Sequence, residues 1–200
     1  MSPQQGTLEQ GAGAAPPTDT LYHFSEDANI AIFVPRTIAS RPELPAAVWA
    51  IDDEHAPLYW LPRDCPRVAF WALPTSTPED RAHFLGETVA RMAIAIEAGW
   101  LDRVRQTTLF VYHLPGVSFG TTAVPGYRIA RVAVMPHRVE PVGDLLARIA
   151  ARGVELRLTP SLWPLYRALL PATLHYSMIR MRNARPEASS PGAGTFLQPG

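Results

Sequence analysis

Short apolar runs separated by turn-forming residues occupy most of the chain. Runs rich in β-branched and aromatic residues, bounded by Pro, Gly and Asp, are typical of β-strands. They predict strands over residues 21–25, 46–51, 68–73, 107–114, 127–134, 154–158 and 177–182. Strands and helices do not alternate strictly, which favours an α+β fold over a parallel α/β sheet. We expect a mixed or antiparallel sheet of about six or seven short strands with two or three helices.

One longer stretch has the period of an α-helix. Thr77 is a suitable N-cap, and Pro78 fits the first helical position. Apolar side chains then recur at spacings of 4, 3 and 4 residues, at Leu85, Val89, Met92 and Ile96. This stripe predicts an amphipathic helix over 78–98 that packs across a sheet and ends at Gly99. Shorter helical segments are predicted over 55–61, 100–105, 142–152 and 162–170.

The two ends of the chain differ from its middle. Residues 1–20 and 185–200 are rich in Gly, Ala, Pro and Ser and have no apolar period, so we expect them to be disordered tails. The chain has 200 residues, 47% of them hydrophobic, which is enough for one well-formed core. We therefore expect a single globular domain over residues 21–184.

The charges of the chain balance, with 18 basic and 18 acidic residues. A neutral chain creates no long-range field for DNA, RNA or an anionic membrane, so we expect no DNA partner. The sequence shows neither the pattern of a secretory leader nor an apolar run of about 18 residues, and it has a single Cys. We therefore expect a cytoplasmic protein without a membrane segment.

Missing residue types and motifs exclude several chemistries. The chain contains no Lys, which removes Schiff-base catalysis and the phosphate-binding loop of P-loop proteins. The G-x-G-x-x-G pattern is missing as well, so the sequence predicts no Rossmann dinucleotide site. G-x-S-x-G occurs once, at 116–120, but it lies in a Gly-containing loop predicted over 115–125 with no predicted helix directly behind it, so it does not predict a nucleophile elbow.

Candidate chemistry is densest between Ala47 and Trp71, where acids, aromatics, Arg, a His and the Cys lie between two apolar runs. With nearby residues, this stretch offers a hydrogen-bonding ring, flat aromatic surfaces, guanidinium groups and acids, which are the types that hold a nucleotide. The candidates are His23, Tyr22, Trp49, Tyr59, Trp60, Arg36, Arg63, Arg67, Asp52 and Glu54. The same residues also permit a structural interpretation, in which aromatics fill the core and Arg pairs with Asp at its rim.

A cysteine nucleophile is a second possibility for this stretch. Flanking Arg residues would lower the pKa of the Cys65 thiol, and His23 or His55 would serve as its base. Asp64 opposes the Arg residues, however, and Pro66 lacks the N–H that often stabilises an oxyanion. The pattern therefore favours a buried and inert Cys65.

A metal site and a nucleic-acid surface have weaker patterns. Asp52 and His55 are three residues apart and would need His23 to complete a metal site, but no HExxH, CxxC or HxH motif supports one. Asp52 also suits the cap of a following helix. The basic run over 180–185 is too short to form a basic surface for nucleic acid, and we interpret it as a solvent-exposed edge of the domain. We predict no metal site.

The chain resembles a family of uncharacterised bacterial proteins known only as a domain of unknown function. The resemblance is carried by LYHFSE at 21–26, FVPR at 33–36, RPELPAAVWAID at 41–52, HAPLYWLPRDCPR at 55–67 and VEPVGDLLA at 139–147. It covers nearly all of 21–184 and implies no activity.

The first strand, with its aromatic-His-x-Ser pattern, is also similar to the start of small ADP-ribosyltransferase-like domains. That resemblance implies NAD as the cofactor, with His23 on a ribose hydroxyl and Tyr59 beside the nicotinamide. It also implies a late acid, for which Glu140 and Asp144 are equal candidates. In this interpretation Arg36 or Arg63 holds phosphate and Trp60 adds a flat surface.

Three hypotheses remain. The first is an ADP-ribosyltransferase-like domain that binds NAD or a related nucleotide through His23 and Tyr59. The second is a non-enzymatic module that binds a protein or a small ligand through the aromatic stretch. The third is a small-molecule hydrolase that uses Asp52, His55 and Cys65. The sequence does not decide whether the protein is an enzyme.

Overall fold

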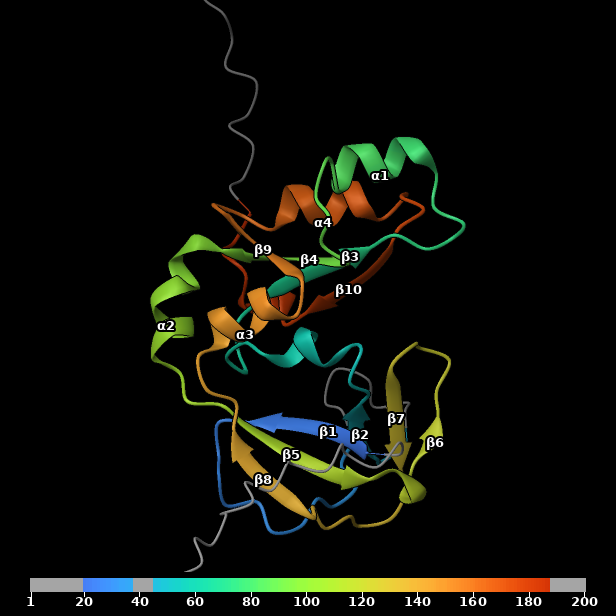
Figure 1. Cartoon of the computed structure of the whole chain (residues 1–200), viewed down its shortest axis with the longest axis vertical. Coiled ribbons are helices and arrows are strands. Elements are labelled where there is room, and N and C mark those ends of the chain that lie inside the picture. Colours follow the sequence, from blue (N-terminus) through green and yellow to red (C-terminus); the bar gives the residue numbers. More distant parts are fainter. Residues whose placement is uncertain (1–19, 38–44, 188–200) are drawn as a thin grey trace, which may run out of the picture.

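The computed structural model describes residues 20–37 and 45–187 and contains two β-sheets, one above the other in Figure 1. The α+β class predicted from the sequence is confirmed. Within the described residues there are ten strands and four α-helices, more than the sequence predicted. The predicted tails lie outside the described residues, apart from Thr20 and residues 185–187 at their inner ends.

The larger sheet has six antiparallel strands in the order β6-β7-β2-β1-β5-β8. Its strands are β1 (Thr20–Ser25), β2 (Val48–Ile51), β5 (Phe110–Pro115), β6 (Gly120–Thr121), β7 (Tyr127–Ala130) and β8 (Arg138–Pro141). β1 pairs with β5 along its whole length. By contrast, β1 and β2 share a single register pair, Tyr22 with Ile51, and the two strands diverge beyond it.

The smaller sheet has four strands in the order β10-β3-β4-β9. Its strands are β3 (Arg67–Trp71), β4 (Met92–Glu97), β9 (Val154–Thr159) and β10 (His175–Ile179). β4 and β9 run parallel, and the other two pairs are antiparallel. β3 and β4 are the central strands, so their backbones are paired on both sides.

The helices cover the smaller sheet on both faces. The α-helices are α1 (Pro78–Phe84), α2 (Leu101–Gln106), α3 (Leu145–Ala151) and α4 (Trp163–Leu169). Short 3₁₀ segments are η1 (Ala56–Tyr59), η2 (Ala98–Trp100), η3 (Gly116–Ser118) and η4 (Met181–Asn183). In Figure 1, α1 and α4 lie over the outer face of the smaller sheet, whereas α3 and the turn containing η1 lie between the two sheets.

The side-chain alternation of β3 shows how the core is divided. Val68 and Phe70 pack with Phe84 of α1 and with side chains of α4. Ala69 faces the opposite way and joins the main core between the two sheets, together with Ile51. Since successive strand residues point to opposite faces, Arg67 shares the inward face with Ala69. This alternation places a guanidinium group between the sheets.

The predicted helix over 78–98 is wrong beyond Phe84. Thr77 caps α1 as expected, because its hydroxyl accepts a hydrogen bond from the Asp80 N–H at 3.2 Å. The helix ends at Phe84, and Gly86 follows its C-cap Leu85 with a φ of 60°, in the left-handed region. Val89, placed on the buried stripe by the prediction, is fully exposed. Residues 92–97 form β4, which is buried on both faces and therefore lacks the alternation that identifies a strand.

Other predicted strands differ mainly at their ends. The predicted strand over 177–182 is instead β10, which stops at Ile179 because Arg180 has a φ of 56°. The sequence did not predict β8, an edge strand whose residues are mostly exposed. Its sequence, RVEP, contains two charged residues and a Pro, and these are typical of strands that end a sheet.

Candidate functional site

A pocket of about 310 Å³ lies between the two sheets, at the low end of the range for small-molecule sites. Aromatic, aliphatic and Arg side chains line it. The lining residues are Tyr22, His23, Phe24, Trp49, Ala50, Ile51, Tyr59, Leu61, Arg63, Arg67, Leu109, Tyr127, Ile179 and Arg180. They come from both sheets and from the turn around η1. No acidic residue of the described chain is among them.

One wall of the pocket is built where β1 and β2 diverge. The His23 ring fills part of this gap, with Nδ1 3.0 Å from the carbonyl oxygen of Trp49. Because a carbonyl only accepts, Nδ1 carries the proton and donates it. Burial lowers the pKa of His23, although the bond to Trp49 opposes this effect. A neutral ring protonated on Nδ1 has an acceptor at Nε2. The same ring packs against Phe33, with 4.7 Å between the ring centres.

A second wall consists of three aromatic rings in edge-to-face contact. The Tyr127 ring lies 6.2 Å from the ring of Trp49 and 6.2 Å from that of Tyr59, measured between centroids. The Tyr59 hydroxyl donates to the Tyr127 hydroxyl over 3.0 Å. Burial raises the pKa of Tyr59, so its phenol stays protonated. These rings offer flat surfaces together with hydroxyl groups, and a nucleobase or a sugar binds to such a wall.

Arg67 is the most unusual residue of the pocket, because its side chain is only 2% exposed. Its Nη1 donates to the carbonyl oxygens of Pro62 at 3.0 Å and Cys65 at 3.3 Å. Its Nε is buried and has no hydrogen-bond partner among the described residues. The guanidinium also lies 5.7 Å from the centre of the Tyr59 ring. Burial lowers the pKa of Arg67, yet an Arg remains charged in a protein.

Two further arginines lie on the other side of the pocket. Arg63 is exposed, and its carbonyl accepts a hydrogen bond from the Arg180 Nε at 3.2 Å. Arg180 is the non-glycine residue with a positive φ in the described chain, a conformation that is strained by roughly 1 kcal/mol or more. Strained residues of this kind often belong to binding sites. Within the described chain, neither guanidinium has a carboxylate partner.

The structure brings together some of the predicted site residues. His23, Tyr59 and Arg63 all line the pocket. Trp60 does not, because its side chain is buried in the main core on the other side of η1. Arg36 is exposed and belongs to an isolated bridge with Ala47, away from the lining residues. The predicted phosphate contact of Arg36 and the flat surface of Trp60 therefore have no place in this pocket.

The two late acids also lie elsewhere. Glu140 is on β8 and accepts a hydrogen bond from His113 Nε2 at 3.0 Å, and it also pairs with Arg138. Asp144 caps α3 by accepting the Ala147 N–H at 3.0 Å. Neither residue lines the pocket. The pocket therefore has the residue types for binding but no carboxylate that would orient a reacting sugar.

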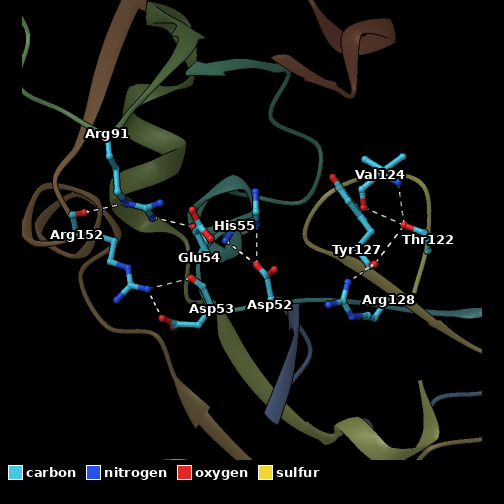
Figure 2. Close-up of polar contacts among 10 residues, drawn as sticks. All are labelled: Asp52, Asp53, Glu54, His55, Arg91, Thr122, Val124, Tyr127, Arg128 and Arg152. Carbon is cyan, nitrogen blue, oxygen red and sulfur yellow. Dashed lines mark hydrogen bonds and ion pairs between the residues drawn. The ribbon is translucent and has the colours of Figure 1, made fainter. Parts of the chain in front are cut away.

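The turn after β2 gathers several polar residues beside the pocket (Figure 2). Asp52 Oδ1 accepts hydrogen bonds from the backbone N–H of His55 at 2.9 Å and from its ring Nδ1 at 2.8 Å. Asp52 therefore fixes His55, the residue before η1, but η1 itself has no side-chain cap, so the predicted capping role of Asp52 is not observed. Gly126, with a φ of 80°, packs against the ring so closely that a Cβ would lie 2.4 Å from its atoms. The His55 ring is therefore held between Asp52 and Gly126.

Arginines from the smaller sheet hold this turn in place, as Figure 2 shows. Arg91 donates to the carbonyl oxygen of Glu54 at 2.8 Å. Arg152 donates to the carbonyl oxygen of Asp53 at 3.1 Å and forms an ion pair with its carboxylate. These contacts join the end of β2 to the start of β4 and to the turn between α3 and β9. They link the two sheets.

Cys65 lacks the surroundings of a nucleophile. Its side chain is completely buried, and burial raises the pKa of its thiol to about 12. The neighbouring Arg67 opposes this shift without overcoming it. Because the thiolate is the reactive form, a thiol with this pKa is inert at neutral pH. A hydrolase mechanism through Cys65 has no support in this geometry.

Sequence reasoning missed part of the pocket. Tyr127 was predicted only as the start of a strand, and Arg180 as part of a solvated edge. Arg67 was named as one of several guanidinium candidates without being distinguished from them. One local signal was available for it: Arg67 opens a strand whose next residues, Val-Ala-Phe-Trp, are all apolar. A charged residue in register with a buried strand is a candidate for a buried charge.

The fold and the pocket define an α+β protein with a pocket lined by aromatic and arginine side chains. Residues 22–184 match the model of a family of unknown function, DUF6886, and the chain belongs to that family. The resemblance to a domain of unknown function is thereby confirmed. Neither the curated proteins nor the solved structures yielded a match to the chain. Within residues 20–37 and 45–187, no helix is long and apolar enough to cross a membrane.

Proposed function

We propose that this protein binds a nucleotide in the pocket between its two sheets. Arg67 carries the proposal, because its guanidinium is buried with no carboxylate partner among the described residues, beside a pocket whose described lining includes no acidic residue. Removing an ion from water without pairing it is unfavourable by several kcal/mol. A bound anion would supply the missing charge and hydrogen bonds.

The remaining lining residues favour a nucleotide over a simple anion. Trp49, Tyr59 and Tyr127 provide a wall on which a base can stack. His23 provides an acceptor for a sugar hydroxyl beside that wall. Trp49, Tyr59 and Tyr127 line the pocket and are only partly exposed, which favours a small ligand over a protein partner for the aromatic stretch. NAD and ADP-ribose are included in the test because of the resemblance of the first strand to ADP-ribosyltransferase-like domains.

The proposal is tested by thermal unfolding of the full chain with NAD, ADP-ribose, AMP and adenosine. A ligand at 100 times its dissociation constant adds about 2.7 kcal/mol of stability. For a protein of this size, that corresponds to a rise in the melting temperature of roughly 5–10 °C. We expect at least one of the phosphorylated compounds to give such a rise. Absence of a rise with every nucleotide at millimolar concentration would overturn the proposal.

Two Arg variants show whether the stabilisation arises in the pocket. Arg67→Met removes the buried guanidinium, and we expect it to abolish the rise. Arg105→Gln is the matched control, because Arg105 is exposed on α2 and pairs with Asp102 of the same helix. The control should respond to nucleotides like the wild type. Equal responses of both variants would place the binding site elsewhere.

A further inference from the structure

The three arginines of the pocket lie at different depths. Arg67 is almost completely buried, Arg180 is partly buried and Arg63 is exposed. Arg67 also belongs to a central strand of the smaller sheet, whereas Arg63 and Arg180 lie in turns that are hydrogen-bonded to each other. The deepest positive charge of the pocket is therefore fixed by the sheet, and the shallower ones lie toward solvent.

The surroundings of Arg67 are closed on the side away from the pocket. The segment behind the guanidinium is buried at Pro62, Cys65 and Pro66, and two of its carbonyl oxygens already occupy Nη1. Tyr59 lies beside the guanidinium on another side. A phosphodiester or a diphosphate at this depth would need space on both sides of the phosphate. A terminal group needs space on only one.

The charge of the pocket favours a phosphate with two negative charges. Both observed hydrogen bonds of Arg67 use Nη1 and its Nε is buried from solvent, so Nη2 is the nitrogen that remains for a contact with an anion in the pocket. A phosphomonoester presents three acceptor oxygens and carries two charges above its second pKa of about 6. A phosphodiester carries one charge and has two such oxygens. Arg63 and Arg180 add positive charge along the route to Arg67.

We propose that the nucleotide of this pocket ends in a phosphomonoester that binds Arg67 at the deep end, with its base against the ring of Trp49 or Tyr127. This inference rests on the proposed function and narrows it to one class of nucleotide. It excludes NAD and ADP-ribose as the preferred ligands, because their phosphates lie in the middle of the molecule. Mononucleotides with a free phosphate are the expected class.

The test compares ligands on the unaltered full chain by isothermal titration calorimetry. The probes are 5′-AMP, 3′-AMP, 2′-AMP, cyclic 2′,3′-AMP, adenosine, NAD and inorganic phosphate. At least one monophosphate should bind about tenfold or more tightly than the cyclic diester, NAD and adenosine, a difference of about 1.4 kcal/mol. Inorganic phosphate, which lacks the base, should bind more weakly than that monophosphate.

The outcomes separate this inference from the proposed function. Tighter binding of NAD or the cyclic diester than of every monophosphate would overturn the terminal-phosphate inference and leave nucleotide binding intact. Equal binding of adenosine and the monophosphates would also overturn it. If no nucleotide binds, the proposed function itself fails. Because these comparisons use the wild-type chain, they do not depend on the folding of a variant.

Two further measurements locate the phosphate. Arg67→Lys keeps the positive charge but loses the planar guanidinium group. It should weaken binding of the preferred monophosphate by about tenfold or more, while adenosine binding is unchanged. Arg63→Gln, nearer to solvent, should have a smaller effect on the same ligand. An Arg63→Gln effect larger than that of Arg67→Lys would overturn the assignment of the deep end. Wild-type affinity should also fall below about pH 6, as the phosphate loses its second charge.

Discussion

Arg91 and Arg152 differ from Arg67 in what surrounds their guanidinium groups, although all three lie where the two sheets meet. Arg91 and Arg152 are at the surface and reach the carbonyl oxygens of Glu54 and Asp53 in the turn after β2 (Figure 2). Arg152 also has the Asp53 carboxylate as a partner. Arg67 is buried, and no carboxylate of the described chain lies within ion-pair distance.

The difference distinguishes a structural role from a binding role. In the turn after β2, Arg152 has a carboxylate partner and Arg91 is exposed to water, and the contacts of both tie the two sheets together. In the pocket, the protein buries a positive charge and leaves part of its hydrogen-bonding capacity unused. Stability alone does not select such an arrangement, because a well-packed apolar side chain in the same place is often as stable. An unpaired buried Arg is therefore the stronger indicator of a ligand.

The largest effect on stability is expected at Gly126, which supports the His55 ring in the turn region. Gly126→Ala places a Cβ against that ring and a side chain at a φ of 80°. Overpacking and backbone strain together should lower the free energy of unfolding by about 3 kcal/mol or more. Urea unfolding measures this change. A decrease below about 1 kcal/mol would mean that the ring moves aside, and that the turn is looser than these contacts indicate.

A smaller loss is expected from the arginines of the same turn. Arg152→Gln and Arg91→Gln should each lower the free energy of unfolding by about 1 kcal/mol, since exposed ion pairs and single hydrogen bonds contribute little. Both variants should keep wild-type nucleotide affinity. Arg105→Gln is the control, because its partner Asp102 lies on the same helix and links no sheets. A loss of affinity in either turn variant, without one in the control, would contradict the separation of the two regions.

A pH-dependent effect is expected at His23. Burial lowers its folded-state pKa below the ordinary 6.5, so the unfolded chain binds a proton more readily than the folded one. Stability is therefore lost as the pH falls below about 6.5, and this contribution is present in full above that value. His23→Asn can still donate to the Trp49 carbonyl but does not titrate. Its unfolding free energy should fall less than that of the wild type between pH 7 and 5. Equal slopes would place the titration elsewhere, for example at His113 or His175, whose pKa values burial also lowers.

The smallest change in stability is expected at Arg67, despite its complete burial. Arg67→Met leaves two carbonyl oxygens without their donor, which is unfavourable by about 1–3 kcal/mol each. It also removes the unfavourable burial of an unpaired cation, an effect of several kcal/mol in the opposite direction. We expect the two effects to offset each other to within about 1 kcal/mol in urea unfolding. A loss above about 3 kcal/mol would show that Arg67 stabilises the fold, as Arg91 and Arg152 do.

The sequence predicted the fold class because most of its strands carry a local pattern. β1, β2 and β3 are short, largely apolar runs and β9 alternates apolar and polar residues, and each was predicted within a few positions. The N-cap of α1 was predicted because Thr77 and Pro78 act on backbone groups within one turn. β4 was mistaken for a helix because both of its faces are buried. A strand without alternation has no period of its own, and three chance spacings between apolar residues matched the period of a helix.

The sequence predicted part of the candidate site, and individual residues show why the prediction was incomplete. His23 and Tyr59 were named from their residue types and local surroundings, and both line the pocket. Trp60, the neighbour of Tyr59, was named for the same reason but faces the core. Glu140 was named from a family resemblance, and it lies on β8 beside His113. The local sequence indicates which residue types are present, but it does not indicate the direction in which each side chain points.

The sequence by itself determined the residue types available for a site and the local strands that carry them. A short pattern is sufficient for this, because caps, turns and apolar runs act over a few residues. Only the tertiary structure decided that Tyr127 meets Tyr59 across 68 residues and that Arg180 meets Arg63 across 117. The tertiary structure also decided that Arg67 is buried with no carboxylate partner among the described residues. The charge partners of a side chain depend on segments far along the chain, and folding alone brings those segments together.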